Sequence, residues 1–310
     1  MRNAALLSGL LSAGLYVAVF TLGLGFLFLF LPTLPIFWLG MTGRSDQALH
    51  SGLAATLLLS LVAGPGSALF YMLIVALPAW YMAHESSKSG RFSGQVIWFP
   101  LTVVVARILA VFVVALLVIS IYYADTKGGL GAHAAERIRQ ASLMLAGKVN
   151  EETLAALQLA AQQYAFLVFA LFAWMWIGCL YLHGWAVCRE LARQKKPARP
   201  DMDITAFPPP NWMIPLLVIS LAAALIGSPW LAFWGQVSLM TLMLPYFLLG
   251  LALIHQHSKK LQNRGFLLFG LYVLLALVLW PVLMVALYGL SHHVRLLNKY
   301  LSGGGNSSRH

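Results

Sequence analysis

The chain has very little charge. Only 9% of its 310 residues are charged, with nine Asp and Glu against twenty Lys and Arg. A water-soluble domain carries about 25% charged residues. Hydrophobic residues make up 60% of the chain, and its mean hydropathy is +0.81. This composition excludes a soluble protein and predicts a polytopic membrane protein.

The chain also lacks the residue patterns that catalysis and metal binding need. Neither H-E-x-x-H, G-x-S-x-G, a P-loop nor C-x-x-C-H occurs in the sequence. No Asp or Glu lies deep in a predicted span, which argues against a carboxylate relay for protons or sodium. The two cysteines, Cys179 and Cys188, have neither a metal-binding nor a redox spacing. We therefore expect no enzymatic activity, no cofactor and no metal.

Apolar runs long enough to span a membrane recur from the N-terminus to residue 290. A helical span needs about 20 apolar residues. We predict an all-α integral membrane bundle of about eight or nine transmembrane helices with a short extracytoplasmic amphipathic helix. It forms a single transmembrane domain over residues 1–300, followed by a flexible tail at 301–310. The spans are expected near 4–22, 24–41, 48–63, 66–84, 97–123, 161–189, 212–227, 230–256 and 265–290.

The distribution of Lys and Arg predicts the orientation. With the N-terminus in the cytoplasm, Arg2, Arg44, Lys88, Arg91 and the cluster at 189–199 all lie inside, as the positive-inside rule favours. Anionic lipid headgroups are the expected partners of these loops. The formal charge of +11 is thereby explained without nucleic-acid binding, which we do not expect.

Two segments are expected outside the bilayer. Residues 130–160 contain an amphipathic helix whose apolar face includes Ala134, Ile138 and Leu145. This extracytoplasmic segment is either a surface connector or a lid over a cavity. Residues 190–211 combine prolines with basic residues, so they are predicted to form a stiff cytoplasmic linker.

Five residues are candidates for lining a cavity. Arg107 lies about 15 Å into its span, where a cation costs at least about 2.5–3.5 kcal/mol. It either contacts a ligand or bonds to backbone carbonyls, and both interpretations stay open. Pro78 and Pro245 interrupt spans and free backbone carbonyls, which must meet protein, water or ligand inside lipid. Trp174 and Trp176 lie deep in their span, against packing neighbours or a cavity.

Small residues recur on the first helix. Ala5, Gly9 and Ala13 lie at four-residue spacing, so another helix can approach closely. The approaching helix belongs either to a partner protein or to this chain. The histidines His183, His255, His257, His292 and His293 are interpreted as interfacial side chains.

Part of the sequence pattern occurs twice. A short span, a hinge with proline, and a longer span containing Leu-Pro occur before His84 and again before His255. Duplicated halves are common in transporters, but apolar sequence of low complexity also mimics repeats. Both explanations remain open.

Five short stretches carry a resemblance to a known family. They are Leu31-Pro32-Thr33-Leu34-Pro35, Leu77-Pro78-Ala79-Trp80, Trp98-Phe99-Pro100, Pro200-Asp201 with Phe207-Pro208, and the run from Tyr246 to His255. Together they resemble the YybS-like bacterial membrane proteins, a family of unknown function. The resemblance implies a multi-pass protein of the bacterial inner membrane and assigns no activity.

The first helix also has a more distant likeness. Its small-residue stripe is similar to the one through which substrate-binding subunits of energy-coupling-factor transporters dock on their energising module. We therefore hold two hypotheses of function. The first is a small-molecule binding or transport subunit without its own energy source. The second is a non-catalytic scaffold or assembly protein that acts through helix–helix contacts.

Overall fold

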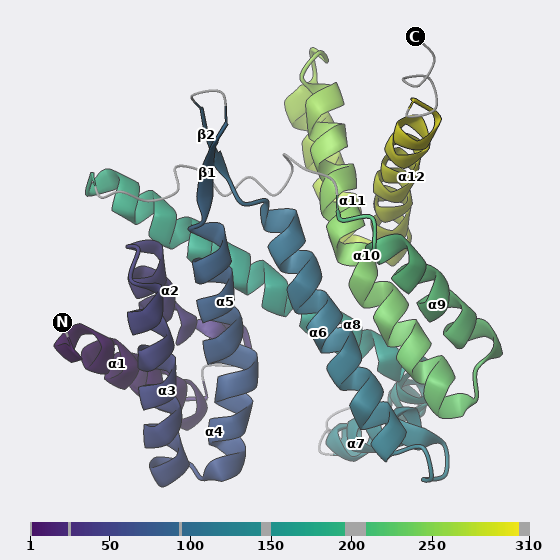
Figure 1. Cartoon of the computed structure of the whole chain (residues 1–310). Coiled ribbons are helices and arrows are strands. Elements are labelled where there is room, and N and C mark those ends of the chain that lie inside the picture. The colour runs from purple at the N-terminus through teal and green to yellow at the C-terminus, as the bar shows by residue number, and fades with distance from the viewer. Residues whose placement is uncertain (1, 24–25, 93–94, 144–149, 196–208, 304–310) are drawn as a thin grey trace. The chain divides into compact units, whose positions relative to one another are not determined.

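The computed structural model describes residues 2–23, 26–92, 95–143, 150–195 and 209–303. Nearly all of the described chain is helical, as predicted for the fold class (Figure 1). The helices are α1 (Arg2–Thr21), η1 (Phe26–Phe30), α2 (Thr33–Met41), α3 (Ser45–Val62), α4 (Pro65–Tyr71), η2 (Met72–Ala76), α5 (Leu77–Ser86), α6 (Leu101–Tyr122), α7 (Gly129–Leu143), α8 (Glu151–Arg193), α9 (Met213–Ile226), α10 (Pro229–Ser258), α11 (Arg264–Leu277) and α12 (Leu279–Gly303). The strands β1 (Ser89–Phe92) and β2 (Gln95–Trp98) form an antiparallel hairpin.

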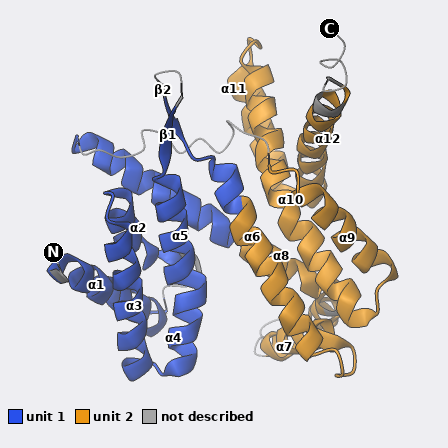
Figure 2. Cartoon of the chain, in the orientation of Figure 1, with its two compact units in different colours: residues 1–105, 175–206 blue, residues 106–174, 207–310 orange. Residues whose placement is uncertain are grey.

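The chain divides into two compact units (Figure 2). Unit 1 comprises residues 1–105 and 175–206, and unit 2 comprises residues 106–174 and 207–310. Helix α8 contributes its first part to unit 2 and its second part to unit 1. Both units are built from apolar helices, so a single transmembrane domain over 1–300 stays a prediction.

Large apolar side chains cover much of the surface of both units. Leu61 is 85% exposed, Ile226 is 86% exposed and Phe266 is 78% exposed. In water such a surface would aggregate, whereas hydrocarbon chains solvate it. The exposed surface therefore fits a helical membrane protein.

Fewer helices span a membrane by length and composition than the sequence predicted. Among the described residues, five helical segments qualify, and the bent pair α11–α12 adds a sixth. The qualifying segments are Asn3–Thr21, Pro65–Ser86, Leu101–Tyr122, Gln163–Arg193 and Pro229–Ser258. The difference lies in three predicted spans. Residues 24–41 contain two short helices, α3 begins with polar residues, and α9 has only 14 residues.

Other predicted boundaries also change. The span expected at 97–123 begins at Leu101, because residues 95–98 pair with β1. The span expected at 265–290 is two helices, bent by 116° around Val278. Pro281 explains this break, since it has no N–H for the carbonyl of Leu277 four residues earlier. The helix expected to run from the extracytoplasmic segment into the span is α8, which is kinked at Tyr164.

In unit 1, a buried polar cluster supports the break between α1 and α2. The Ser12 hydroxyl donates to the carbonyl of Pro32 at 2.6 Å and also pairs with the Tyr71 hydroxyl. Thr33 donates to the carbonyl of Phe30 and hydrogen-bonds His183 Nδ1 at 2.9 Å. The non-helical backbone therefore finds its partners inside the protein, as it must within a bilayer.

In unit 2, glycines bring helix backbones into direct contact. A Cβ at Gly250 of α10 would fall on the carbonyl oxygen of Val285 in α12. A Cβ at Gly289 of α12 would fall on the carbonyl oxygen of Tyr246. A Cβ at Gly235 of α10 would likewise meet backbone atoms of Ser220 and Ala224 in α9. Small residues at helix crossings allow this close approach in membrane proteins.

Helix α7 is packed against the start of α10. Gly129, with φ of +63°, lies so close to Trp230 that a Cβ would meet its backbone. Gly131 lies against the ring of Phe233 in the same manner. The predicted amphipathic helix is therefore docked on unit 2, and whether it works as a connector or as a lid stays a prediction.

Candidate functional site

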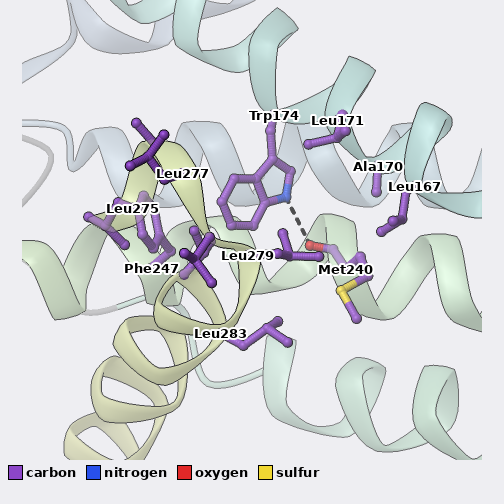
Figure 3. A pocket seen from close by; sticks show the side chains of 13 residues that line it. Leu167, Ala170, Leu171, Trp174, Met240, Phe247, Leu275, Leu277, Leu279 and Leu283 are labelled. Atoms are coloured by element: carbon purple, nitrogen blue, oxygen red, sulfur yellow. Dashed lines mark hydrogen bonds between the residues drawn. The ribbon is translucent and has the colours of Figure 1, made fainter. Parts of the chain in front are cut away.

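The best-defined cavity lies in unit 2, where α8, α10 and the elbow between α11 and α12 meet (Figure 3). Its volume is about 410 Å³, within the range of about 300–1,000 Å³ for small-molecule sites. Helix α8 supplies one wall, α10 supplies a second, and the elbow supplies the third. The thirteen lining residues are Leu167, Ala170, Leu171, Trp174, Met240, Phe247, Leu275, Ala276, Leu277, Val278, Leu279, Val282 and Leu283.

All thirteen lining side chains are apolar or aromatic. The only N–H among their side chains belongs to the indole of Trp174, and it donates to the carbonyl of Met240 at 2.9 Å. The same indole packs on the ring of Phe247, with 5.2 Å between ring centroids. The side chains of the lining thus offer no free N–H donor and no charge to a ligand. Chemically, they can exchange only dispersion and hydrophobic contact with an occupant.

The sequence positions this cavity through two prolines. Pro281 lies in the first turn of α12 and favours the elbow, whose residues line the cavity together with those of α8 and α10. Pro245 is buried in α10, two residues before Phe247. Because Pro245 has no N–H, it cannot hydrogen-bond to the carbonyl of Thr241. The neighbouring carbonyl, that of Met240, accepts the hydrogen bond from Trp174. Two of the helical segments that line the cavity are therefore ones that a proline interrupts.

Unit 1 contains a similar pairing of a proline with a tryptophan. Pro78 is buried in α5 and follows the π-helical turn η2. It leaves the carbonyl of Ile74 without its usual helical partner. The indole of Trp176 donates to this carbonyl at 2.8 Å. Trp174 and Trp176 thus hydrogen-bond to carbonyls of two different helical segments, each of which contains a proline.

The five predicted cavity residues are therefore separated. Trp174 lines the cavity, Pro245 lies beside it, and Pro78 and Trp176 belong together in unit 1. Arg107 is exposed on α6 and does not belong to the cavity lining. A ligand role for Arg107 and for the proline sites stays a prediction.

The small-residue stripe on α1 faces α3 of the same chain. Ala5 and Ala13 are buried, and a Cβ at Gly9 would meet the Ser51 carbonyl at 2.8 Å and the Ala54 side chain at 3.2 Å. Packing of α1 against α3 within this chain accounts for these contacts. Docking of a partner protein on the same face stays a prediction.

Sequence analysis missed a polar cluster in unit 2. His293 was interpreted as interfacial, but it is only 2% exposed. Its Nε2 hydrogen-bonds Asn211 Oδ1 at 3.0 Å, and its ring stacks on Tyr246, with centroids 5.8 Å apart. The basic, tail-like sequence around His293 concealed this role. The one available signal was Tyr246 itself, a hydroxyl within a long apolar run.

Helix α7 lies outside the predicted spans and carries a glutamate, Glu136, whose carboxylate accepts several hydrogen bonds. Arg139 donates to both carboxylate oxygens of Glu136 at 2.7 Å, and Gln140 donates at 3.0 Å. These hydrogen bonds lower the pKa of Glu136 from 4.5 to about 2. Both side chains border an open hollow between α7 and α8 with Gln158.

We expect Glu136 to stay ionised at pH 4, where an ordinary glutamic acid is largely protonated. Because the pKa is lowered in the folded state, the contribution of the pair is present above pH 4.5 and disappears as the pH falls toward 2. NMR titration of labelled Glu136 checks this expectation. Arg139→Gln should return the pKa toward 4.5, whereas Arg137→Gln, which removes only a weaker coulombic contribution, should raise it less. An unchanged pKa in Arg139→Gln would contradict the assignment.

Comparisons with curated proteins and with solved structures found no match. A comparison with protein families matched residues 5–291 to the predicted membrane proteins of family DUF2232. The match covers nearly the whole chain, including both units and all of the cavity residues. With its apolar surface and its membrane-length helices, the chain belongs to the DUF2232 family of predicted membrane proteins.

Proposed function

We propose that this protein binds a hydrophobic small molecule inside the bilayer, in the cavity beneath the α11–α12 elbow. The observation that carries the proposal is the chemistry of the cavity lining, which is apolar in all thirteen positions. An occupant gains stability there by burying apolar surface, at about 25 cal/mol per Å². The class of ligand that fits this lining is a single hydrocarbon chain, such as the acyl chain of a lipid.

The cavity is reached from the lipid-facing surface. Leu171, Leu277 and Leu279 line it and are also 56%, 78% and 49% exposed. A hydrocarbon chain can therefore enter from the bilayer without crossing a polar layer. This accessibility favours a ligand that already resides in the membrane over one that arrives from water.

The wider biological role follows the first of the two hypotheses. We infer a binding or transport subunit of the bacterial inner membrane, with a cytoplasmic N-terminus and with energy supplied by a partner. The apolar cavity supports the binding role. The resemblance to YybS-like proteins assigns no activity, and α3 covers the small-residue stripe on which the likeness to energy-coupling-factor subunits rests. The scaffold hypothesis draws less support, because α3 of the same chain covers the small-residue face of α1.

Quenching of tryptophan fluorescence by dibrominated stearate tests the proposal. Trp174 lines the cavity, so we expect a saturable quenching component when the purified protein is titrated in nanodiscs. Ala170→Phe and Val282→Phe fill the cavity from two opposite walls and should each abolish this component. Val168→Phe is the matched control, because Val168 lies on α8, is 53% exposed and does not line the cavity.

The proposal fails if the quenching of the native protein does not saturate. It also fails if both filled variants fold, as judged by size-exclusion chromatography, and keep the saturable component. Mass spectrometry of the protein purified mildly from its own membrane then identifies the compound that it retains.

A further inference from the structure

Six buried side-chain atoms of unit 2 have no hydrogen-bond partner within the described residues, and two of them belong to side chains that pack on each other. These two atoms are the hydroxyl of Tyr246 on α10 and Nδ1 of His293 on α12. Tyr246 is 0% exposed and His293 is 2% exposed. A buried polar group without a partner lowers the stability of the folded protein. Native proteins therefore fill such positions with protein, water or ligand.

The two atoms belong to one cluster. The rings of Tyr246 and His293 stack at 5.8 Å and with 30° between their planes. The neighbouring backbone contact at Gly289 holds α12 against the Tyr246 carbonyl.

Some buried hydroxyls of the chain find partners close by, whereas those of Ser120, Ser238 and Thr241 have none within the described residues. Ser220 donates to the carbonyl of Leu216 at 2.8 Å, four residues earlier, as serines in helices commonly do. The fully buried Tyr71 of unit 1 pairs with the Ser12 hydroxyl. A tyrosine hydroxyl cannot reach back to its own helix in this way, so Tyr246 needs a partner from elsewhere.

The hydrogen-bond pattern of His293 defines what that partner is. Because Nε2 faces an oxygen of Asn211, it carries the proton and donates. In the neutral ring, Nδ1 is then an acceptor. The Tyr246 hydroxyl has a proton to donate. A group that satisfies both atoms accepts one hydrogen bond and donates another.

We propose that the Tyr246–His293 pair is a binding site for one hydroxyl group. The hydroxyl accepts from Tyr246 and donates to Nδ1 of His293. It is supplied either by a water molecule or by the hydroxyl of a bound lipid or ligand. This site is formed by α10 and α12 and does not depend on the occupant of the apolar cavity, since neither Tyr246 nor His293 lines that cavity.

The test is the thermal stability of Tyr246→Phe in nanodiscs. This variant keeps the stacked ring and removes only the hydroxyl. If the hydroxyl is bonded in the native protein, the midpoint of unfolding falls by a few degrees, as for a paired buried tyrosine. Tyr71→Phe sets the size of that fall, and Tyr288→Phe, a 36% exposed residue of α12, controls for surface effects.

An unchanged or raised midpoint in Tyr246→Phe would overturn the proposal, because removing an unpaired buried hydroxyl relieves a cost. The fall should also shrink when His293 is already replaced by Phe, which keeps a ring and removes both nitrogens. Additive effects of the two changes would overturn the bridging hydroxyl.

An experimental structure in lipid provides the second readout. Density within hydrogen-bond distance of both Tyr246 Oη and His293 Nδ1 is expected, and its absence would overturn the proposal. Delipidation distinguishes the two sources. If the effect of Tyr246→Phe persists after delipidation, the hydroxyl belongs to water, and if the effect disappears, it belongs to a lipid.

Discussion

Gly289→Ala is expected to disrupt unit 2, although it adds a single methyl group. The new Cβ would fall on the carbonyl oxygen of Tyr246 and within 2.8 Å of the Gly250 nitrogen. Both obstacles are backbone atoms of α10, so no flexible side chain can yield. Overpacking typically costs about 1–3 kcal/mol and occasionally more. We expect a large loss of folded protein, measured by fluorescence-detected size-exclusion chromatography.

Gly270→Ala is the matched control for this change. Gly270 also lies within a helix, α11, but a Cβ there meets no atom within 4 Å. Alanine favours helix over glycine by roughly 0.5–1 kcal/mol, so this variant should keep or slightly raise the yield of folded protein. Equal behaviour of the two variants would show that α10 and α12 do not cross at Gly289.

Trp176→Ala is expected to have the other large effect. The side chain is 4% exposed, and removing a buried tryptophan costs about 3–5 kcal/mol. Trp176→Phe isolates the hydrogen bond. Phenylalanine keeps most of the buried ring but leaves the Ile74 carbonyl without the indole N–H, at a cost of about 1–3 kcal/mol. Thermal unfolding in detergent should rank the native protein above Trp176→Phe and Trp176→Phe above Trp176→Ala.

Trp280→Phe serves as the control, because Trp280 is 70% exposed and makes no comparable bond that the structure describes. Its midpoint should stay close to that of the native protein. If Trp176→Phe behaves like Trp280→Phe, the Ile74 carbonyl has another partner and the proposed match of Trp176 with Pro78 is wrong.

Much of the fold could be predicted from composition and apolar runs. The bilayer imposes length and hydrophobicity on every span, so five predicted helices agree with segments that qualify as spans. The sequence predicted a short span at 212–227, and α9 has 14 residues. It did not reveal that α11 and α12 meet at an elbow, because a proline within an apolar run is compatible with a kinked helix as well as with a break.

The candidate site was harder to predict for the same reason. Pro78, Pro245, Trp174 and Trp176 were singled out from the sequence as candidates inside spans. Their pairing was not predictable, because each tryptophan meets a carbonyl at least 66 residues away in the chain. His293 was misjudged because its neighbours in sequence are basic, whereas its neighbours in space are Tyr246 and Asn211.

The interleaving of the two units has a consequence for biosynthesis. Unit 1 needs residues 175–206 as well as 1–105, so the ribosome must synthesise residues 106–174 before unit 1 can be complete. Until α8 has entered the membrane, the Ile74 carbonyl lacks the indole that it meets in the finished protein. Unit 2 must likewise wait for α12, which follows its other described helices in the chain. Insertion and folding are therefore separate stages here, and a nascent chain halted before α8 should be a ready target for membrane quality-control proteases.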